Sequence, residues 1–263
     1  MSVSQVAPQP KKQRPPPKPV AVASIERVTP GVLRIAFVGA GLDAFAQARP
    51  GAHMKLFFTA GEWPPAGIEN PPRPPSRTYT PRRYDAAASR LEVEFVMHGA
   101  GLASDWAAQA KVGDPMLISA SPGGGYQAPE GISHLVIIAD DSALPAAGMV
   151  IESLPSGVGV TAICEVENAA EERPLSPRVN CAPRWLHRET GNARPGSLLE
   201  TAVAGMATLP ADAHVWVACE AAAMRHIRDN LAARFNLPRA RLHTRGYWKF
   251  GDQNYPDHDY GED

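Results

Sequence analysis

Four consecutive residues carry the groups that a flavin nucleotide requires: Arg77, Thr78, Tyr79 and Thr80. An arginine can form two parallel hydrogen bonds to a phosphate, a tyrosine ring can stack on a planar heterocycle, and a threonine hydroxyl can hydrogen-bond a ring nitrogen. On a strand, alternation places Arg77 and Tyr79 on one face and the two threonines on the other, as far as the break at Pro81. The segment predicts a flavin site; the alternative is an ordinary barrel strand with a surface arginine.

A second stretch has two glycines before a short helix-compatible segment: His98-Gly99-Ala100-Gly101-Leu102-Ala103-Ser104. Glycines let the backbone approach a ligand closely, and a helix start presents free N–H groups and a positive dipole end. With the Ser104 hydroxyl, this arrangement can hold a pyrophosphate; the alternative is a tight turn with a capped helix. We expect His98 to shape the turn and not to bind a metal, because no partner stands at ligand spacing. Together the two stretches favour FAD over FMN, because the flavin end and the phosphate end lie on separate elements.

Composition limits the classes of protein to which these stretches belong. The chain has 263 residues, 44% of them hydrophobic, which is enough for packed cores in one large domain or two ordinary ones. A net charge of -1 gives no field that attracts nucleic acid or an anionic membrane. The three cysteines form no C-x-x-C pair, which argues against a disulfide framework, a zinc site or an iron–sulfur cluster and favours a reducing cytoplasm. No apolar run is long enough to span a bilayer, so we expect no membrane insertion.

The first half of the chain predicts a barrel. Residues 1–19 are basic and proline-rich, and we expect a disordered or polyproline-like tail. Over residues 20–130, short β-type runs between turns predict a closed six-stranded antiparallel barrel. The predicted strands are 20–28, 32–38, 53–59, 77–84, 91–98 and 115–120. The proline-rich insertion 63–75 predicts an irregular loop at the rim, because prolines cannot donate to a sheet.

Over residues 131–263, strand and helix patterns alternate, which predicts an open parallel α/β sheet with ligands at the carboxyl ends of its strands. The predicted strands are 134–139, 158–166, 214–218 and 242–248, with helices after residue 142 and over 197–206 and 221–235, and an arm over 179–189. No G-x-G-x-x-G is present. The candidate nucleotide contacts near strand ends are Asp141, Ser142, Glu165 and Glu220. Because an acidic side chain at Glu165 favours a free ribose 2′-hydroxyl, we expect NADH to be preferred to NADPH.

Five motifs in order resemble those of the siderophore-interacting proteins, which are FAD-binding ferric-siderophore reductases of the ferredoxin-reductase-like superfamily. They are Arg77-Thr-Tyr79-Thr80, His98-Gly-x-Gly101-x-Ala-Ser104-x-Trp106-Ala, Asp141-Ser-Ala-Leu144-Pro145-Ala, Trp185-Leu-His187-Arg188 and Gly246-Tyr247-Trp248-Lys249. The resemblance covers nearly the whole chain after the tail and implies a six-stranded FAD barrel followed by an α/β pyridine-nucleotide-type domain.

The resemblance also implies roles for single residues. It assigns Arg77, Tyr79 and Thr80 to the flavin, and Gly101, Ala103 and Ser104 to the FAD pyrophosphate. It implies that Tyr247 and Trp248 close over the flavin side of the cavity. Lys55 and Lys249 resemble positions where the family sets basic residues around its siderophore. The sequence departs from the family pattern at two places. Ala218-Cys219-Glu220 replaces the usual Ala-Gly-Glu, and residues 121–124 lack the arginine often found there.

The implied reaction starts with a nicotinamide nucleotide, or ferredoxin, as electron donor to the flavin, and the flavin passes single electrons to a ferric siderophore. Ferrous iron binds hard oxygen donors more weakly and is released. Thr80 is the side chain expected nearest to the chemistry. The alternatives are a carrier that binds a siderophore without catalysis, and a general flavin reductase or ferredoxin-coupled flavoprotein.

Overall fold

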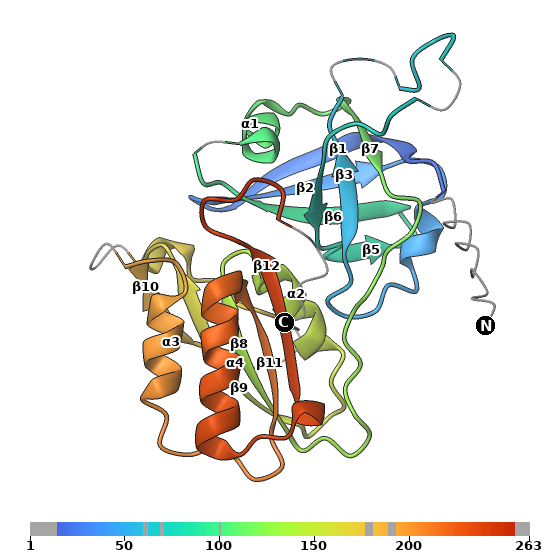
Figure 1. The fold of residues 1–263 in the computed structure, drawn as a ribbon. Coiled ribbons are helices and arrows are strands. Elements are labelled where there is room, and N and C mark those ends of the chain that lie inside the picture. The colour runs from blue at the N-terminus through green and yellow to red at the C-terminus, as the bar shows by residue number, and fades with distance from the viewer. Residues whose placement is uncertain are drawn as a thin grey trace, which may run out of the picture.

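The chain forms two sheets with their own helices, one above the other in the view of Figure 1. This computed structural model describes residues 15–59, 61, 63–68, 71–99, 101–176, 181–188 and 193–255. The first sheet is antiparallel and has the order β4-β3-β7-β1-β2-β6-β5, and the second is parallel with the order β10-β9-β8-β11-β12. The expectation of a β domain followed by a parallel α/β sheet is confirmed.

The first sheet curls into a half-barrel of seven strands, one more than expected. Its strands are β1 (Lys18–Thr29), β2 (Val32–Val38), β3 (Met54–Phe57), β4 (Ser76–Tyr79), β5 (Arg83–Asp85), β6 (Arg90–Val96) and β7 (Pro115–Ile118). The expected strand 77–84 is interrupted around Pro81, and its halves pair with β3 at one edge and β6 at the other. Proline has no N–H to donate, so the strand ends there and the chain crosses between the two edges.

The expected tail ends earlier than residue 19, because Lys18 already pairs with Ile118 of β7. The Nζ of Lys18 also donates to the carbonyl of Gly41, at the start of the short 3-10 helix η1 (Leu42–Phe45). Residues 15–17 have no helix or strand, and Pro17 is buried, while residues 1–14 of the predicted tail lie outside the described residues. The described residues of the insertion 63–75 have no helix or strand, as expected for a loop.

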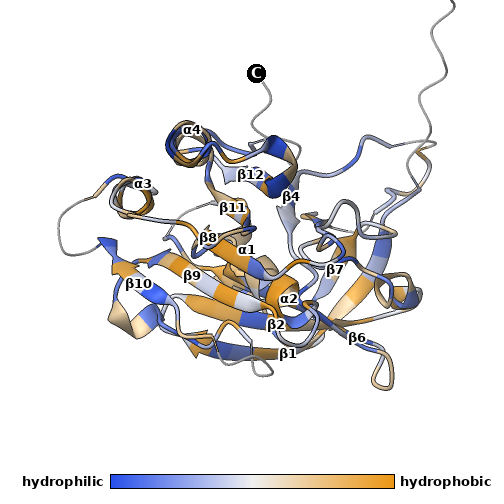
Figure 2. Cartoon of the chain, turned by 90° about the horizontal axis from the view of Figure 1, so that it is seen from below, coloured by the Kyte–Doolittle hydropathy of each residue, from blue (hydrophilic) through white to orange (hydrophobic). Residues whose placement is uncertain are grey.

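The parallel sheet is buried on both faces. Its elements are β8 (His134–Asp140), α2 (Leu144–Glu152), β9 (Gly159–Val166), β10 (Arg184–His187), α3 (Ser197–Ala204), β11 (His214–Glu220), α4 (Ala221–Phe235) and β12 (Leu242–Trp248). Helix α2 packs with one apolar core, and α3 and α4 pack side by side with a second core on the opposite face. Figure 2 shows β8 and β9 largely in the hydrophobic colour, as strands covered on both faces require. The expected arm contains β10, which pairs with β9 as an edge strand.

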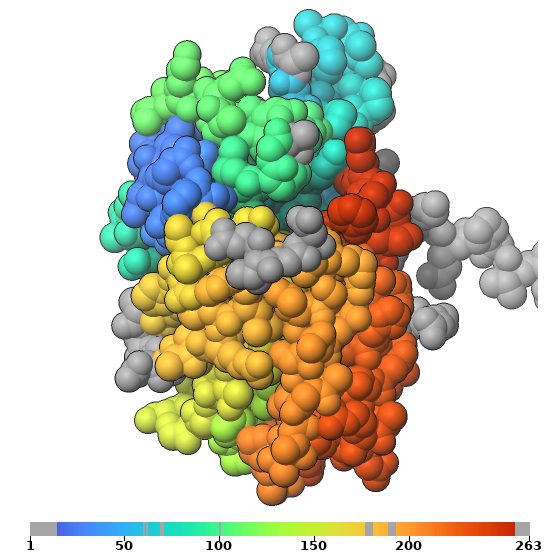
Figure 3. All heavy atoms as spheres, turned by 90° about the vertical axis from the view of Figure 1, so that its left-hand side faces the viewer, coloured from blue at the N-terminus to red at the C-terminus, as the bar shows by residue number. Residues whose placement is uncertain are grey.

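Polar contacts join the half-barrel to the parallel sheet. The Glu171 carboxylate accepts from the Thr29 hydroxyl and, at 2.8 Å, from Gly31 N. The Arg82 guanidinium donates to the Glu152 carboxylate at 2.7 Å. In Figure 3 the yellow atoms of the segment after β9 lie directly against the blue atoms of the first strands. These contacts fix the position of the parallel sheet relative to the end of β4, where the flavin motif lies.

Candidate functional site

The flavin motif has the alternation expected from its sequence. In the pairing of β3 with β4, Arg77 lies opposite Leu56 and Tyr79 lies opposite Met54. Since directly paired residues share a face and both partners belong to the barrel core, Arg77 and Tyr79 face the inner side. Thr78 is exposed on the outer side, and its hydroxyl accepts from the Nζ of Lys55 at 3.2 Å.

An aromatic cluster links β4 to helix α1 (Leu102–Gln109). The Tyr79 ring lies with its centroid 4.5 Å from that of Phe95, and the Phe95 ring lies 5.7 Å from Trp106 of α1. Trp106 also packs on Phe37 and Phe58, so it anchors α1 on the half-barrel. Burial raises the pKa of the Tyr79 hydroxyl, so its ring stays neutral. Phe95 was missed by the sequence reasoning, although the alternation of apolar and acidic residues along β6 marks it as inward-facing.

The start of α1 fits a phosphate group. Gly99 and Gly101 have φ angles of 85° and 120°, a region that residues with side chains rarely adopt. Ser104 is 3% exposed, and its Oγ has no hydrogen-bond partner among the described residues. A buried hydroxyl without a partner beside the free N–H groups of a helix start is suited to an anionic ligand. The Asp105 carboxylate accepts from Gly101 N at 3.3 Å, but Asp105 is exposed and can turn away.

The other predicted residues of this stretch surround the helix start. His98 is exposed, and a Cβ placed on Gly101 would lie 3.4 Å from its ring. Ala103 is buried and Leu102 packs against the barrel core. Within the described residues, the fit to FAD therefore rests on the backbone and Ser104, and direct contacts of His98 and Leu102 with the cofactor remain predictions.

The end of β12 meets the end of β4. A hydrogen bond joins the hydroxyls of Thr80 and Tyr247, and burial raises the pKa of Tyr247 to about 12. Thr80 is buried, unlike the exposed Thr78, because the strand has ended and the chain turns toward the parallel sheet. The next residue, Trp248, donates from Nε1 to Asp140 Oδ2 at 2.8 Å. The structure thus brings Tyr247 to Thr80 and Trp248 to Asp140, and closure of the aromatic pair over a flavin remains a prediction.

Three carboxylates lie buried at the carboxyl ends of the parallel strands: Asp140, Glu165 and Glu220. Glu165 accepts from Gly196 N at 2.8 Å and Leu199 N at 3.3 Å, so it caps the start of α3. Glu220 accepts from Ala223 N at 2.9 Å and caps α4. These are internal roles at helix starts, where free N–H groups need an acceptor.

The predicted nucleotide contacts already have partners inside the protein, and their contact with a nucleotide remains a prediction. Glu165 is 0% exposed and also pairs with Arg188, so the structure gives no support to the expected preference for NADH. Asp141 pairs with the same Arg188 at 2.5 Å. Ser142 donates from its N and Oγ to Asp140. The sequence shows an acidic residue at the end of β9. It does not show that the start of α3, which comes later in the chain, lies against that residue.

The two predicted substrate lysines have different neighbours. Lys55 contacts Thr78, whereas exposed Lys249 pairs with Asp252 at 2.9 Å. A shared cavity for them remains a prediction. The loop 121–124 has another cation beside it, because Arg245 Nη1 would lie 3.1 Å from a Cβ placed on Gly124. Arg245 Nη2 also lies 3.1 Å from His53 Nδ1.

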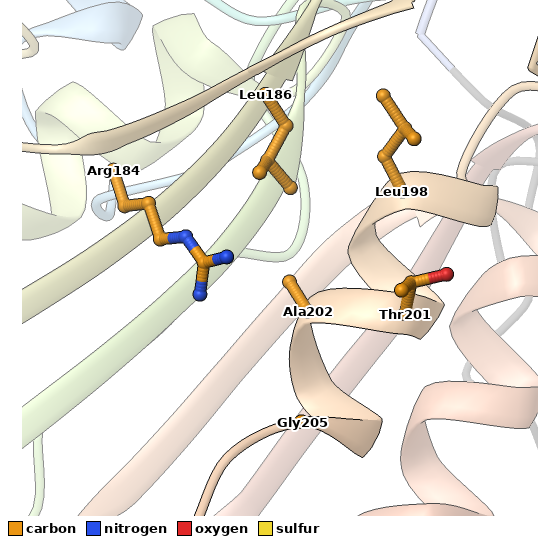
Figure 4. A pocket seen from close by; sticks show the side chains of 6 residues that line it. All are labelled: Arg184, Leu186, Leu198, Thr201, Ala202 and Gly205. Carbon is orange, nitrogen blue, oxygen red and sulfur yellow. The ribbon is translucent and has the colours of Figure 1, made fainter. Parts of the chain in front are cut away.

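The cavity shown in Figure 4 lies elsewhere, between β10 and α3, and has a volume of about 350 Å³. Its lining residues are Arg184, Leu186, Leu198, Thr201, Ala202 and Gly205, none of which was a predicted site residue. In the part of the chain that the structure describes, no three side chains of metal-ligating type cluster together. No helix in that part is both long and apolar enough to cross a membrane.

Comparisons with known proteins agree with this geometry. Residues 21–126 match the family model for the siderophore-interacting FAD-binding domain, and residues 132–251 match that for siderophore-interacting protein. The NADPH-dependent ferric-chelate reductase of Escherichia coli is 31% identical over 87% of this chain and 91% of its own. The ferric vibriobactin reductase of Vibrio cholerae is 27% identical over 85% and 86%. A siderophore utilization protein from T. fusca superposes with a TM-score of 0.78 at 32% identity, covering 94% of this chain and 98% of that one. The chain belongs to the siderophore-interacting protein family.

Proposed function

We propose that this protein binds FAD and uses it to reduce ferric siderophores, which releases ferrous iron. The observation that carries the proposal is the unpartnered, buried hydroxyl of Ser104 at the start of α1, joined through Trp106 and Phe95 to the Tyr79 ring. A phosphate-binding element and a stacking ring on one rigid frame suit a dinucleotide flavin. The match to an FAD-binding domain and the names of two reductase relatives support the same function.

The residues of the chain bind and orient the cofactor. The N–H groups of α1 and Ser104 would hold the pyrophosphate, Arg77 would meet a phosphate oxygen, and Tyr79 would stack on the flavin. When bound, FAD supplies the capacity to accept two electrons and to pass them on singly. Thr80 would hydrogen-bond the flavin edge, and its link to Tyr247 keeps its hydroxyl at that place.

For the electron donor, the proposal is a nicotinamide nucleotide, with ferredoxin as the alternative. The preference for NADH has lost its structural support because Glu165 is enclosed. One relative is named for NADPH dependence, so NADPH is the first donor to test. The proposed place of the reaction is the cytoplasm, in keeping with the free thiols of Cys164, Cys181 and Cys219.

The substrate is a ferric siderophore, which is commonly anionic, and the proposed contacts are Lys55 and Lys249. The net charge of -1 means that such a ligand must be attracted by local cations. Arg245 is a third cation, beside the loop that lacks the family's arginine.

The test is an anaerobic titration of the FAD-loaded protein. The yellow colour should bleach with NADPH or NADH and return when a ferric siderophore is added, while a ferrous-specific chelator reports one ferrous ion per electron. Colour that returns with free FMN but not with the ferric chelate would favour a general flavin reductase. Siderophore binding without any return of colour would favour a carrier.

A further inference from the structure

Asp140 makes contacts that neither the FAD site nor the reduction of iron requires by itself. It ends β8 and is 0% exposed. Its Oδ2 accepts from Trp248 Nε1 at 2.8 Å and from Glu220 N at 2.9 Å, and its Oδ1 accepts from Ser142 N at 3.1 Å. Because β11 lies between β8 and β12, this one carboxylate ties together the carboxyl ends of three strands.

We propose that Asp140 is a positioning residue that holds Trp248, and through it the adjoining Tyr247, at the flavin end of the site. The inference deepens the proposed function and rests on it for the role of that site. The contact itself can be tested without FAD or substrate.

The backbone of β12 explains how the end of one strand contacts both β4 and β8. Gly246 pairs with Cys219 and Trp248 pairs with Glu220, so Tyr247 is an extra residue in β12. Such a bulge re-aims the side chains around it. The Tyr247 hydroxyl meets Thr80 at the end of β4, whereas the Trp248 indole meets Asp140. If the Trp248 contact loosens, the bulge that presents Tyr247 to the flavin strand loses its anchor.

The charges around Asp140 make this contact sensitive to pH. Asp141 lies on its own turn, Glu165 on β9, Glu220 and Cys219 on β11, and Tyr247 on β12. The cations of this cluster pair with its other groups: Arg188 with Asp141 and Glu165, and Arg194 with Glu220 at 3.7 Å, while Arg245 lies near Tyr247. Burial, followed by the charge of Asp141, raises the pKa of Asp140 to about 7.

The direction of the pH effect on Trp248 follows from the hydrogen bonds of Asp140. Above pH 7 the ionised carboxylate accepts charge-assisted hydrogen bonds, which are roughly twice as strong as neutral ones. Below pH 7 the added proton neutralises both oxygens, and the hold on the indole weakens. Trp248 is therefore held more firmly when Asp140 is ionised than when it is protonated.

The experiment measures tryptophan fluorescence and acrylamide quenching of the FAD-free protein between pH 5.5 and 8.5, and compares wild type with Trp248→Phe, Asp140→Asn and the double variant. Trp248→Phe keeps a ring and loses the N–H. The wild-type signal minus the Trp248→Phe signal isolates Trp248, and we expect it to show stronger quenching on the acid side with a midpoint near pH 7. The same difference taken in the Asp140→Asn background should show no step. Trp185→Phe, which changes a half-buried tryptophan of β10, is the control and should keep the step.

A Trp248 difference signal without a step between pH 5.5 and 8.5, or one in Asp140→Asn that titrates as in wild type, would overturn the proposal. If Asp140→Asn does not fold, the comparison of wild type with Trp248→Phe still decides. In the FAD-loaded protein, Asp140→Asn or Trp248→Phe alone should remove the same step from the pH profile of flavin reduction. The double variant should lose no more of the flavin-reduction rate than one single variant does. Since the fluorescence is measured without FAD, a failed reductase assay leaves the Asp140 result intact, and a failed Asp140 result leaves the reductase proposal intact.

Discussion

Replacement of Ser104 by alanine tests the phosphate end of the site, because opposite effects are expected without and with FAD. In the free protein the Ser104 Oγ is buried and has no partner among the described residues. An unsatisfied buried hydroxyl costs about 1–3 kcal/mol, so its removal should leave the free energy of unfolding unchanged or raise it by about 1 kcal/mol. With FAD bound, the same hydroxyl would donate to a phosphate. A hydrogen bond to a charged group contributes about 1.5–3 kcal/mol, which predicts an FAD Kd raised roughly 10- to 100-fold in the alanine variant.

Two measurements separate these effects: urea unfolding of the FAD-free protein, followed by circular dichroism, and FAD titration, followed by flavin fluorescence. Ser153→Ala is the matched control, because the Ser153 hydroxyl donates to Val150 O at 2.7 Å at the far end of α2. That variant should lose up to about 1 kcal/mol of stability and bind FAD as wild type does. An unchanged Kd in Ser104→Ala, or a loss of stability as large as that of the control, would refute the assignment of Ser104.

Three further changes test the other parts of the site. Tyr79→Ala should lower flavin occupancy after gel filtration by removing stacking of about 1 kcal/mol or more, and should also destabilise the barrel because the ring packs on Phe95. Tyr79→Phe should keep both the occupancy and the stability. Full flavin occupancy in the alanine variant would contradict stacking. Asp105→Asn should lower the FAD Kd a few-fold at low salt and less at high salt, because a carboxylate then no longer faces the phosphate at the helix start; equal Kd values would contradict this. Lys55→Ala and Lys249→Ala should raise the half-saturating siderophore concentration and flatten its salt dependence, while the rate of flavin reduction by the donor stays unchanged. Wild-type kinetics in the double variant would show that the positive charge that attracts the siderophore lies elsewhere.

Elements with a strong periodic pattern were predicted from the sequence nearly to the residue. Strands β2 and β12 and helix α4 have the predicted bounds. Their signals are local: in α4 the buried Met224, Ile227 and Leu231 recur at helical spacing, and β2 and β12 are short runs of β-type residues. The break in the expected strand 77–84 was missed for a non-local reason. The segment has β-type residues on both sides of Pro81, and only the pairing with β3 and β6 shows that its halves belong to opposite edges.

In the candidate site too, local features could be predicted from the sequence and contacts between distant segments could not. The flavin motif and the glycines before α1 were found because their chemistry is written in adjacent residues, and Phe95 was missed because its contact with Tyr79 spans two strands. Asp140 was also missed, although it stands next to the predicted Asp141. Asp140 turns inward as the last residue of β8 and Asp141 outward to Arg188, and this difference depends on where the strand ends.

The expectation that an acidic strand end contacts a ribose has no structural support here, for a reason that concerns helix starts. Of the three helices that begin at the carboxyl edge of the sheet, α3 has its N–H groups facing Glu165 and α4 has them facing Glu220. Helix α2 has no side-chain cap at Ala143 and carries a proline in its first turn. The oxygens of Glu165 that would meet a ribose hydroxyl instead accept from the N–H groups of Gly196 and Leu199. In this chain the acidic strand ends stabilise α3 and α4 and therefore do not indicate which nucleotide is bound.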